Sequence, residues 1–303
     1  MLFITQTALE LGFMYALVSM ALFLSYRVLD IADLTTDGTF VLGMAVSVSL
    51  AAAGHPFLAI PAAMAAGACA GFVTAFLQTR LGVPSILAGI VTNTGLYTIN
   101  LMAMGWSSNV NLLKQETIFS LFRATGIGGD WYELIIAAVI TIAAGLVIIW
   151  LLGTRLGLSI RATGDNRDMV RASSVNPVFT VTVGLCVSNA LTALSGAIVG
   201  QMQKSADING GTGIVVIGLA CLIIGETVIG KGSVKRGVLA VIIGSILYRF
   251  LYAVVLRTGI VPIECLKLVT AVIVGLAIAM PALRNYAAFQ KRKWSAGRRK
   301  GGR

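Results

Sequence analysis

Two stretches of the chain are similar in sequence, and this similarity is the main indication of its fold. The earlier stretch is ADLTTDGTFVLGMA (residues 32–45), and the later one is ADINGGTGIVVIGLA (residues 206–220). Both begin with Ala-Asp-aliphatic, continue through a short polar segment, and end as Gly-x4-Gly-x-Ala in an apolar run. One inserted residue separates their registers.

A second echo follows in the same order. RLGVP (residues 80–84) returns as RTGIVP (residues 257–262), so both matches lie about 175 positions apart. Two ordered matches at one offset predict a duplicated unit, which in membrane proteins is typical of a transporter built from two related halves. Chance similarity is the alternative, because Gly/Ala/Val-rich apolar sequence matches itself easily.

The composition indicates a membrane protein. Of the 303 residues, 57% are hydrophobic and 12% are charged, and the mean hydropathy is +0.90. A soluble domain carries about 25% charged residues. We therefore expect an all-α integral membrane protein, with residues 1–283 as its transmembrane domain and residues 284–303 as a basic cytoplasmic tail. No basic segment or small-residue cleavage pattern flanks the first apolar run, which is interpreted as a resident helix.

Metal and nucleic-acid chemistry are not expected. The four cysteines (Cys69, Cys186, Cys221 and Cys265) are scattered singly, and the only histidine is His55. This pattern favours buried packing cysteines over a metal site or a disulfide framework. The net charge of +11 lies mostly in the tail, where an anchor against anionic lipid explains it better than nucleic acid does.

The hydropathy pattern predicts nine transmembrane spans. They are expected at about 7–27, 37–54, 57–79, 86–105, 133–153, 178–201, 213–230, 237–256 and 265–283. The loop 154–177, the Lys231–Arg236 turn and the tail are basic, which places all three in the cytoplasm and the N-terminus outside. The His55 turn and the 106–132 and 202–212 loops then face outward.

This topology makes the two halves inverted. The 32–45 copy enters the membrane from inside and the 206–220 copy enters from outside, so spans 1–4 are expected to mirror spans 6–9, with span 5 as the connector. Inverted halves allow one fold to open to either face, which is the geometric basis of alternating access. The pairs Gly67/Gly71 and Gly196/Gly200 are expected to pack helices closely.

One stretch imitates a nucleotide-binding loop. Residues 225–233 read GETVIGKGS, which approaches G-x4-G-K-[ST] but has Gly232 in place of the hydroxyl residue. A P-loop also needs a strand before it and a helix after it. An apolar span precedes this stretch, so we expect no ATP site in this chain.

The most polar loop is residues 154–177. Gly164 is predicted to break it, Asp165 or Asn166 to cap a short helix running to about Ser174, and Asn176-Pro177 to open span 6. A short charged and apolar helix on the inner face suggests a docking element. An ordinary solvated connector is the alternative.

At this loop the chain resembles a known family. RATGDN (residues 161–166) and the following helix are similar to the cytoplasmic coupling loop of ABC importer permeases of the branched-chain amino acid/ribose type. DLTTDG (residues 33–38) and the 213–232 stretch resemble that family too, although Gly225-Glu226-Thr227 stands where many members have Gly-Gly-Thr. LYTINL (residues 96–101) further resembles a branch often paired with tryptophan- or tyrosine-type solute-binding proteins.

The resemblance implies a transport subunit that is not itself an enzyme, in the bacterial cytoplasmic (inner) membrane. Its implied partners are ABC ATPase subunits that carry the ATP and Mg, a second permease copy in a homodimer or heterodimer, and an external solute-binding protein. No cofactor is implied for this chain itself. The coupling residues expected from the resemblance are Arg161, Gly164, Asp165, Asn166, Arg167, Asp168 and Arg171. The binding protein is expected to dock on loop 106–132 through Asn109, Asn111, Lys114 and Glu116.

Polar residues within apolar spans are the candidate substrate pathway, because they are costly in lipid unless they are paired or face water. These are Thr36, Asp37, Thr92, Asn93, Thr94, Asn100, Ser188, Asn189 and Thr212. For each of them, buried hydrogen bonding between helices is an open alternative. For the intramembrane charges Glu226 and Arg249, pairing, or snorkelling of Glu226 towards Lys231, is favoured over a proton relay.

The expected function is therefore an ATP-driven importer permease for a small polar organic solute, expected to be an aromatic or branched-chain amino acid. An ion-coupled secondary transporter remains an alternative, in which Asp37 or Glu226 would cycle with the substrate. A membrane enzyme lacks a catalytic set in this sequence, and a structural scaffold leaves the repeat unexplained.

Overall fold

The computed structural model describes residues 2–112, 115–124, 126, 129–230 and 232–258, with six isolated positions between 268 and 279. In chain order, its elements are α1 (Leu2–Leu22), the π-helical η1 (Phe23–Val28), α2 (Thr36–Ala52), α3 (Pro56–Thr79), α4 (Ser85–Ala103), β1 (Asn109–Asn111), α5 (Ile118–Ala124), η2 (Gly129–Trp131), α6 (Tyr132–Gly153), α7 (Arg155–Asp165), α8 (Arg167–Ala172), α9 (Pro177–Gln203), β2 (Ser205–Asp207), α10 (Ile214–Ile229) and α11 (Val234–Thr258).

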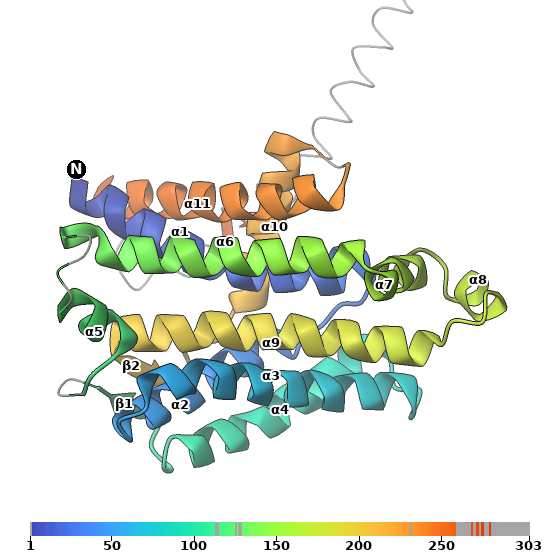
Figure 1. The fold of residues 1–303 in the computed structure, drawn as a ribbon, viewed down its shortest axis with the longest axis horizontal. Coiled ribbons are helices and arrows are strands. Elements are labelled where there is room, and N and C mark those ends of the chain that lie inside the picture. The colour runs from blue at the N-terminus through green and yellow to red at the C-terminus, as the bar shows by residue number, and fades with distance from the viewer. Residues whose placement is uncertain are drawn as a thin grey trace, which may run out of the picture.

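The described part of the chain is a bundle of long helices (Figure 1). Six of its helices are long and apolar enough to cross a membrane: Thr5–Val28, α3, α4, α6, α9 and Val234–Val255. Two shorter apolar helices, α2 and α10, have 17 and 16 residues. Eight of the predicted spans thus correspond to helices, although the spans at 37–54 and 213–230 are shorter than expected. Apart from those six positions, the predicted span 265–283 lies outside the described residues, as does the whole tail.

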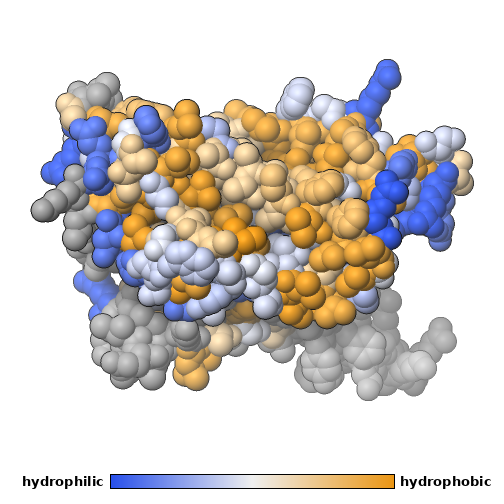
Figure 2. Space-filling view, turned by 90° about the horizontal axis from the view of Figure 1, so that it is seen from below, coloured by the Kyte–Doolittle hydropathy of each residue, from blue (hydrophilic) through white to orange (hydrophobic). Residues whose placement is uncertain are grey.

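The surface has the pattern of a membrane protein. Figure 2 shows hydrophilic side chains gathered at the two ends of the long axis, with apolar side chains over most of the face between them. Large apolar side chains on α3, α4 and α6 are exposed, including Phe57 (64%), Leu146 (62%) and Trp150 (70%). Exposure on this scale in helices of this length indicates contact with lipid hydrocarbon rather than water.

Helix α9 lies at the centre and packs against α2 and α3 through glycines. A methyl group on Gly196 of α9 would overlap the carbonyl oxygen of Phe40 in α2, and one on Gly43 of α2 would overlap the backbone of Ala193 in α9. A Cβ on Gly67 or Gly71 of α3 would likewise lie 2.5 Å from a carbonyl oxygen of α9. The packing role predicted for Gly67, Gly71 and Gly196 is confirmed, because only glycine permits these approaches. Gly200 has more room, with the Val48 side chain 3.1 Å from its Cβ position.

The two ends of the bundle carry different small elements. The N-terminus, α5 and the β1–β2 pair lie at one end, and α7 and α8 lie at the other (Figure 1). Strand β1 pairs antiparallel with β2, with Val110 opposite Ala206. Parts of the segments 106–132 and 202–212, which were expected as loops, therefore pair in one small sheet. Helix α5 lies at the same end of the bundle (Figure 1). The side of the membrane that each end faces stays a prediction.

The polar segment 154–177 forms two helices rather than one. Thr154 caps α7, Asn166 caps α8 through the amides of Asp168 and Met169 (both 3.0 Å), and Asn176 caps α9. The predicted cap at Asn166 is confirmed, although α8 ends at Ala172. The prediction that Gly164 breaks the chain is wrong. Gly164 lies inside α7, where a methyl group would overlap the carbonyl oxygen of Val28, so this glycine packs α7 against η1.

Candidate functional site

The two similar stretches, residues 32–45 and 206–220, meet in space. Each stretch ends in a short helix, α2 or α10, and the carboxylate of Asp37 in the first turn of α2 accepts hydrogen bonds from the start of α10. The donors are the amides of Gly213 (3.0 Å) and Val215 (2.9 Å). Helix N-termini carry unpaired N–H groups and a partial positive charge. A carboxylate placed there accepts hydrogen bonds from these groups and interacts favourably with the charge. The inverted relation of the two halves stays a prediction.

Gly211 makes this junction possible. A Cβ at Gly211 would overlap the carbonyl oxygen of Asp37, so the backbone before α10 passes directly against α2. Gly213 follows with a φ of 85°, a conformation that disfavours other residues. Glycine is therefore required in the segment before α10, because the starts of α2 and α10 approach each other closely there.

A polar cavity of about 350 Å³ opens beside this junction. Three segments line it: the first turns of α2, the middle of α4, and the turn before α10. The lining residues are Asp37, Gly38, Val41, Asn93, Thr94, Tyr97, Asn100, Ile208, Asn209, Gly211 and Thr212. Five of the nine predicted pathway residues are thus brought together here: Asp37, Asn93, Thr94, Asn100 and Thr212.

The other four predicted pathway residues are buried in helix packing. Thr36 donates to the carbonyl of Asp33, Thr92 to that of Ala88, and Ser188 to that of Ala21. The Asn189 amide donates to the carboxylate of Asp33 at 2.7 Å and accepts from the hydroxyl of Thr39 at 2.8 Å. Ser188 and Asn189 thus make the bonds between helices that the alternative describes, whereas Thr36 and Thr92 bond to carbonyls of their own segment.

The buried carboxylate of Asp33 was not predicted as a site residue. It is 2% exposed and also accepts from the amide of Thr35 at 2.9 Å. With Asn189 and Thr39 it joins the segment before α2 to α9, while the Thr35 hydroxyl lies 2.8 Å from that of Thr74 in α3. This network fixes the point where the chain turns into α2, and so it positions Asp37.

Sequence reasoning also missed Tyr97 and Asn209 in the cavity lining. A signal for Tyr97 existed, since Asn93, Tyr97 and Asn100 lie at i, i+4 and i+7 and so share one face of α4. For Asn209 the signal was weaker, because it depends on the pairing of β2 with β1.

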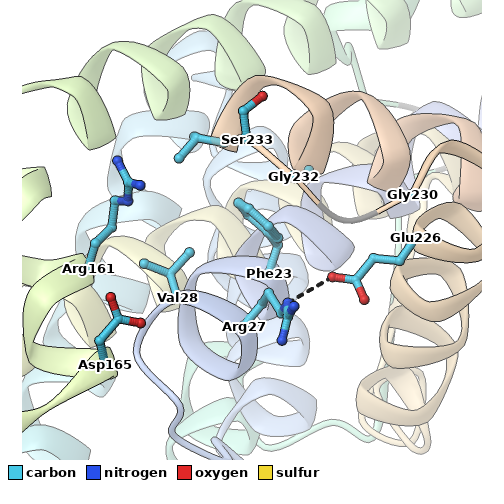
Figure 3. A pocket seen from close by; sticks show the side chains of 11 residues that line it. Phe23, Arg27, Val28, Arg161, Asp165, Glu226, Gly230, Gly232 and Ser233 are labelled. Atoms are coloured by element: carbon cyan, nitrogen blue, oxygen red, sulfur yellow. Dashed lines mark ion pairs between the residues drawn. The ribbon is translucent and has the colours of Figure 1, made fainter.

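A second pocket, of about 170 Å³, lies at the α7 end of the molecule (Figure 3). Arg161 and Asp165 reach into it from α7, and Phe23 and Arg27 from η1. Arg27 forms an ion pair with Glu226 of α10, with 3.0 Å between Nε and Oε1. The pocket also contacts the turn that joins α10 to α11 through Gly232 and Ser233.

These contacts refine three expectations. Glu226 pairs with Arg27, a partner that the sequence analysis did not name. Lys231, towards which Glu226 was expected to snorkel, lies outside the described residues. Arg249 stacks over the ring of Tyr15, with 3.8 Å between its Cζ and the ring centroid. In the P-loop look-alike, Gly225 to Ile229 belong to α10, where a methyl group on Gly225 would overlap the carbonyl oxygen of Ala240.

The predicted coupling residues divide into two sets. Arg161, Gly164 and Asp165 belong to α7 and face η1 or the pocket behind it. On α8, Arg167, Asp168 and Arg171 are exposed, and the Asp168–Arg171 pair of 3.8 Å leaves their side chains 94% and 67% exposed. Helix α8 thus presents a charged surface at the end of the molecule, with Val170 as its buried residue.

Among the described residues, no group of three or more His, Cys, Asp or Glu side chains is arranged to hold a metal ion. The six helices that are long and apolar enough to cross a membrane define a multi-pass membrane protein. Residues 4–281 match the family described as the permease component of branched-chain amino acid transport systems. The chain belongs to this family of ABC transporter permeases.

Three relatives illustrate the family. The tyrosine transport system permease protein of Clostridioides difficile is 30% identical over 260 residues, covering 86% of this chain and 85% of the relative. The uncharacterized protein RP368 of Rickettsia prowazekii is 31% identical over 90% of this chain and 96% of its own length. The ribose import permease protein RbsC of Escherichia coli K12 is 28% identical, over 72% of this chain and 67% of its own. No solved structure matches the chain significantly.

Proposed function

We propose that this chain is the translocation subunit of an ATP-driven importer, and that its solute is a small amino acid-type molecule with an aromatic or branched side chain. The junction of α2 and α10 at the polar cavity carries the proposal. Two short helices that start against each other inside an apolar bundle form the kind of broken-helix site at which transporters bind or pass their solutes.

The proposed mechanism is alternating access at this junction. Asp37 holds the starts of α2 and α10 together through backbone hydrogen bonds, and neither helix is long enough to cross the bilayer alone. A relative movement of these two helices would open the cavity to one end of the bundle and then to the other. The family membership supports the inward direction, since relatives include a permease named for ribose import.

Helix α8 is the proposed contact for the ATPase subunits. Its charged residues Arg167, Asp168 and Arg171 are exposed at one end of the bundle. Helix α7 connects this surface to the interior, since Gly164 packs on η1 and Arg161 and Asp165 line the pocket that contains the Arg27–Glu226 pair. A movement of α8 would thus be passed through α7 and η1 to α10.

The proposed assembly contains a second permease copy and an extracytoplasmic solute-binding protein. The small sheet of β1 and β2, at the end opposite α8, exposes Asn109 and Asn111 and is the proposed dock for the binding protein. In this assembly the membrane is the bacterial cytoplasmic membrane, and α8 faces the cytoplasm. ATP and Mg are bound by the partner ATPase.

The two carboxylates that an ion-coupled carrier would use already have structural partners. Asp37 accepts from two backbone amides, and Glu226 pairs with Arg27. This arrangement supports the ATP-driven proposal over the carrier.

The test is uptake of labelled L-tyrosine or L-leucine by cells that express the complete system. Arsenate depletes ATP while the proton gradient is maintained, and a protonophore collapses the gradient while ATP is held constant. We expect uptake to stop with arsenate and to persist with the protonophore. The reverse pattern would replace this proposal with an ion-coupled carrier.

A further inference from the structure

The cavity beside the α2–α10 junction has an unused hydrogen-bond acceptor deep in its lining. Asn100 of α4 is 2% exposed, and its amide nitrogen donates to the carbonyl of Gly38 at 3.1 Å. This bond fixes the orientation of the amide, because a carbonyl can only accept. The other side-chain atom, Oδ1, is buried and has no hydrogen-bond partner among the described residues. Such a buried, unpaired acceptor is costly, which calls for a specific explanation.

The charges of the lining indicate which kind of ligand would satisfy it. Asp37 is the charged side chain of the described lining, and Lys and Arg are absent from it. Each Asp37 oxygen accepts one backbone bond and retains further acceptor capacity. The lining therefore combines a carboxylate with a buried amide oxygen, and it favours a cationic hydrogen-bond donor over an anion.

The rest of the lining suits the remainder of such a solute. The side chains of Asn93, Asn209 and Thr212 make no hydrogen bond within the described part of the chain, so their amide and hydroxyl groups are available to a carboxylate. Tyr97 contributes an aromatic ring that is 52% exposed. A cavity of about 350 Å³ falls in the size range of small-molecule sites.

From this arrangement we propose that the cavity is a recognition site for a primary ammonium group. The α-ammonium of an amino acid-type solute donates to Oδ1 of Asn100 and interacts with the carboxylate of Asp37, while the neutral polar side chains receive its carboxylate. The inference rests on the proposed transport function for its biological meaning. It assigns to the permease itself a selection between amines and uncharged solutes such as sugars.

The test measures binding to the purified full-length chain in lipid nanodiscs, without any partner. The probes are L-tyrosine and L-leucine, their N-acetyl derivatives, which lack the ammonium group, and D-ribose. We expect at least one free amino acid to bind in the millimolar range or tighter, and its N-acetyl derivative and D-ribose to bind at least about 10-fold more weakly, as loss of a charged hydrogen bond predicts.

Two variants separate the site from the fold. Asn100→Leu is expected to weaken amino acid binding about 10- to 100-fold. Ser49→Ala is the matched control, because Ser49 of α2 also donates to a backbone carbonyl of α4, that of Ala103 at 2.6 Å, but does not line the cavity. It should bind as the unmodified chain does, and a variant that fails to fold is recognised by its thermal unfolding.

Three outcomes would overturn the site: no free amino acid binds, the N-acetyl derivative binds equally well, or Asn100→Leu and Ser49→Ala bind alike. None of these affects the uptake test, which does not depend on binding to the isolated permease. ATP-driven uptake without this selectivity would leave the proposed function in place and assign solute choice to the external binding protein.

Discussion

Asp37 of α2 accepts a hydrogen bond of 2.9 Å from the backbone amide of Val215 in α10, across 178 positions of sequence. With the bond from Gly213, it ties the start of α10 to the first turn of α2. Asp37 is therefore a direct link between the two stretches of similar sequence.

The first prediction concerns this link. Asp37→Asn keeps the shape of the side chain but loses the charge, so one of its two terminal atoms becomes a donor facing a backbone N–H. We expect a loss of about 1–2 kcal/mol in stability, which is typical for a helix-start carboxylate. The measurement is thermal unfolding in detergent, with Asp207→Asn as the control, since Asp207 at the end of β2 accepts one exposed bond from the nearby amide of Asn209. Equal midpoints for the two variants would contradict the link.

The second prediction tests the close contact between α2 and α9. Gly196→Ala places a methyl group against the carbonyl oxygen of Phe40, and backbone cannot move aside cheaply, so we expect a loss of about 1–3 kcal/mol. Gly95→Ala is the control, because Gly95 is also helical but has open space at its Cβ position. That change should be neutral or stabilising by up to about 1 kcal/mol from helix propensity. A Gly196→Ala protein as stable as Gly95→Ala would show that the two helices are further apart than described.

The third prediction concerns the ion pair of Arg27 and Glu226. Arg27 is half exposed, so breaking the pair should cost at most about 1 kcal/mol of stability. Breaking the pair should affect transport more than stability, because the pair joins η1 to α10 next to α7. We expect Arg27→Glu to reduce ATP-driven uptake and the double variant Arg27→Glu/Glu226→Arg to recover part of it. Uptake is compared at matched expression, and a double variant no better than the single one would remove the pair from the mechanism.

The fourth prediction separates the role of α8 from that of other charged residues at the same end of the bundle. Arg171→Glu reverses an exposed charge on α8, and we expect at least a 10-fold loss of uptake with unchanged thermal unfolding. Arg80→Glu is the control, because Arg80 is also exposed but caps α3 instead. If both variants transport normally, the ATPase does not dock on α8. Gly164 is unsuitable for this purpose, because its contact with Val28 makes its substitution a test of folding.

The sequence predicted the helices of the described region well because lipid imposes a simple rule of length and polarity. The two shortest predicted spans, 37–54 and 213–230, correspond to α2 and α10. The sequence did not predict that these helices start against each other, since the apolar run of 213–230 reads the same whether it spans the membrane or begins within it. The coupling segment was resolved only in part. The cap at Asn166 is a local signal. Gly164, in contrast, is a glycine because its backbone packs against Val28, more than 130 positions away, and no local pattern reveals that contact.

The candidate site shows the same division. Polarity within apolar helices identified Asn93, Asn100 and Asp37, because unpaired polar groups are costly in a membrane whatever their role. The same rule also selected Ser188 and Asn189, which have partners within the bundle. Only the fold separates the residues that line the cavity from those that bond within the bundle. In the sequence, both kinds of residue are simply polar positions within apolar helices.

The most direct test of the account is the composition of the complex that this chain forms. The tagged full-length protein is captured from its native membrane in mild detergent, and the co-purifying proteins are identified and quantified by mass spectrometry. We predict a P-loop ATPase in a 1:1 ratio with the permease, which an Arg171→Glu variant loses. If no ATPase is present, in a detergent that preserves a known transporter complex, the ATP-driven account is contradicted.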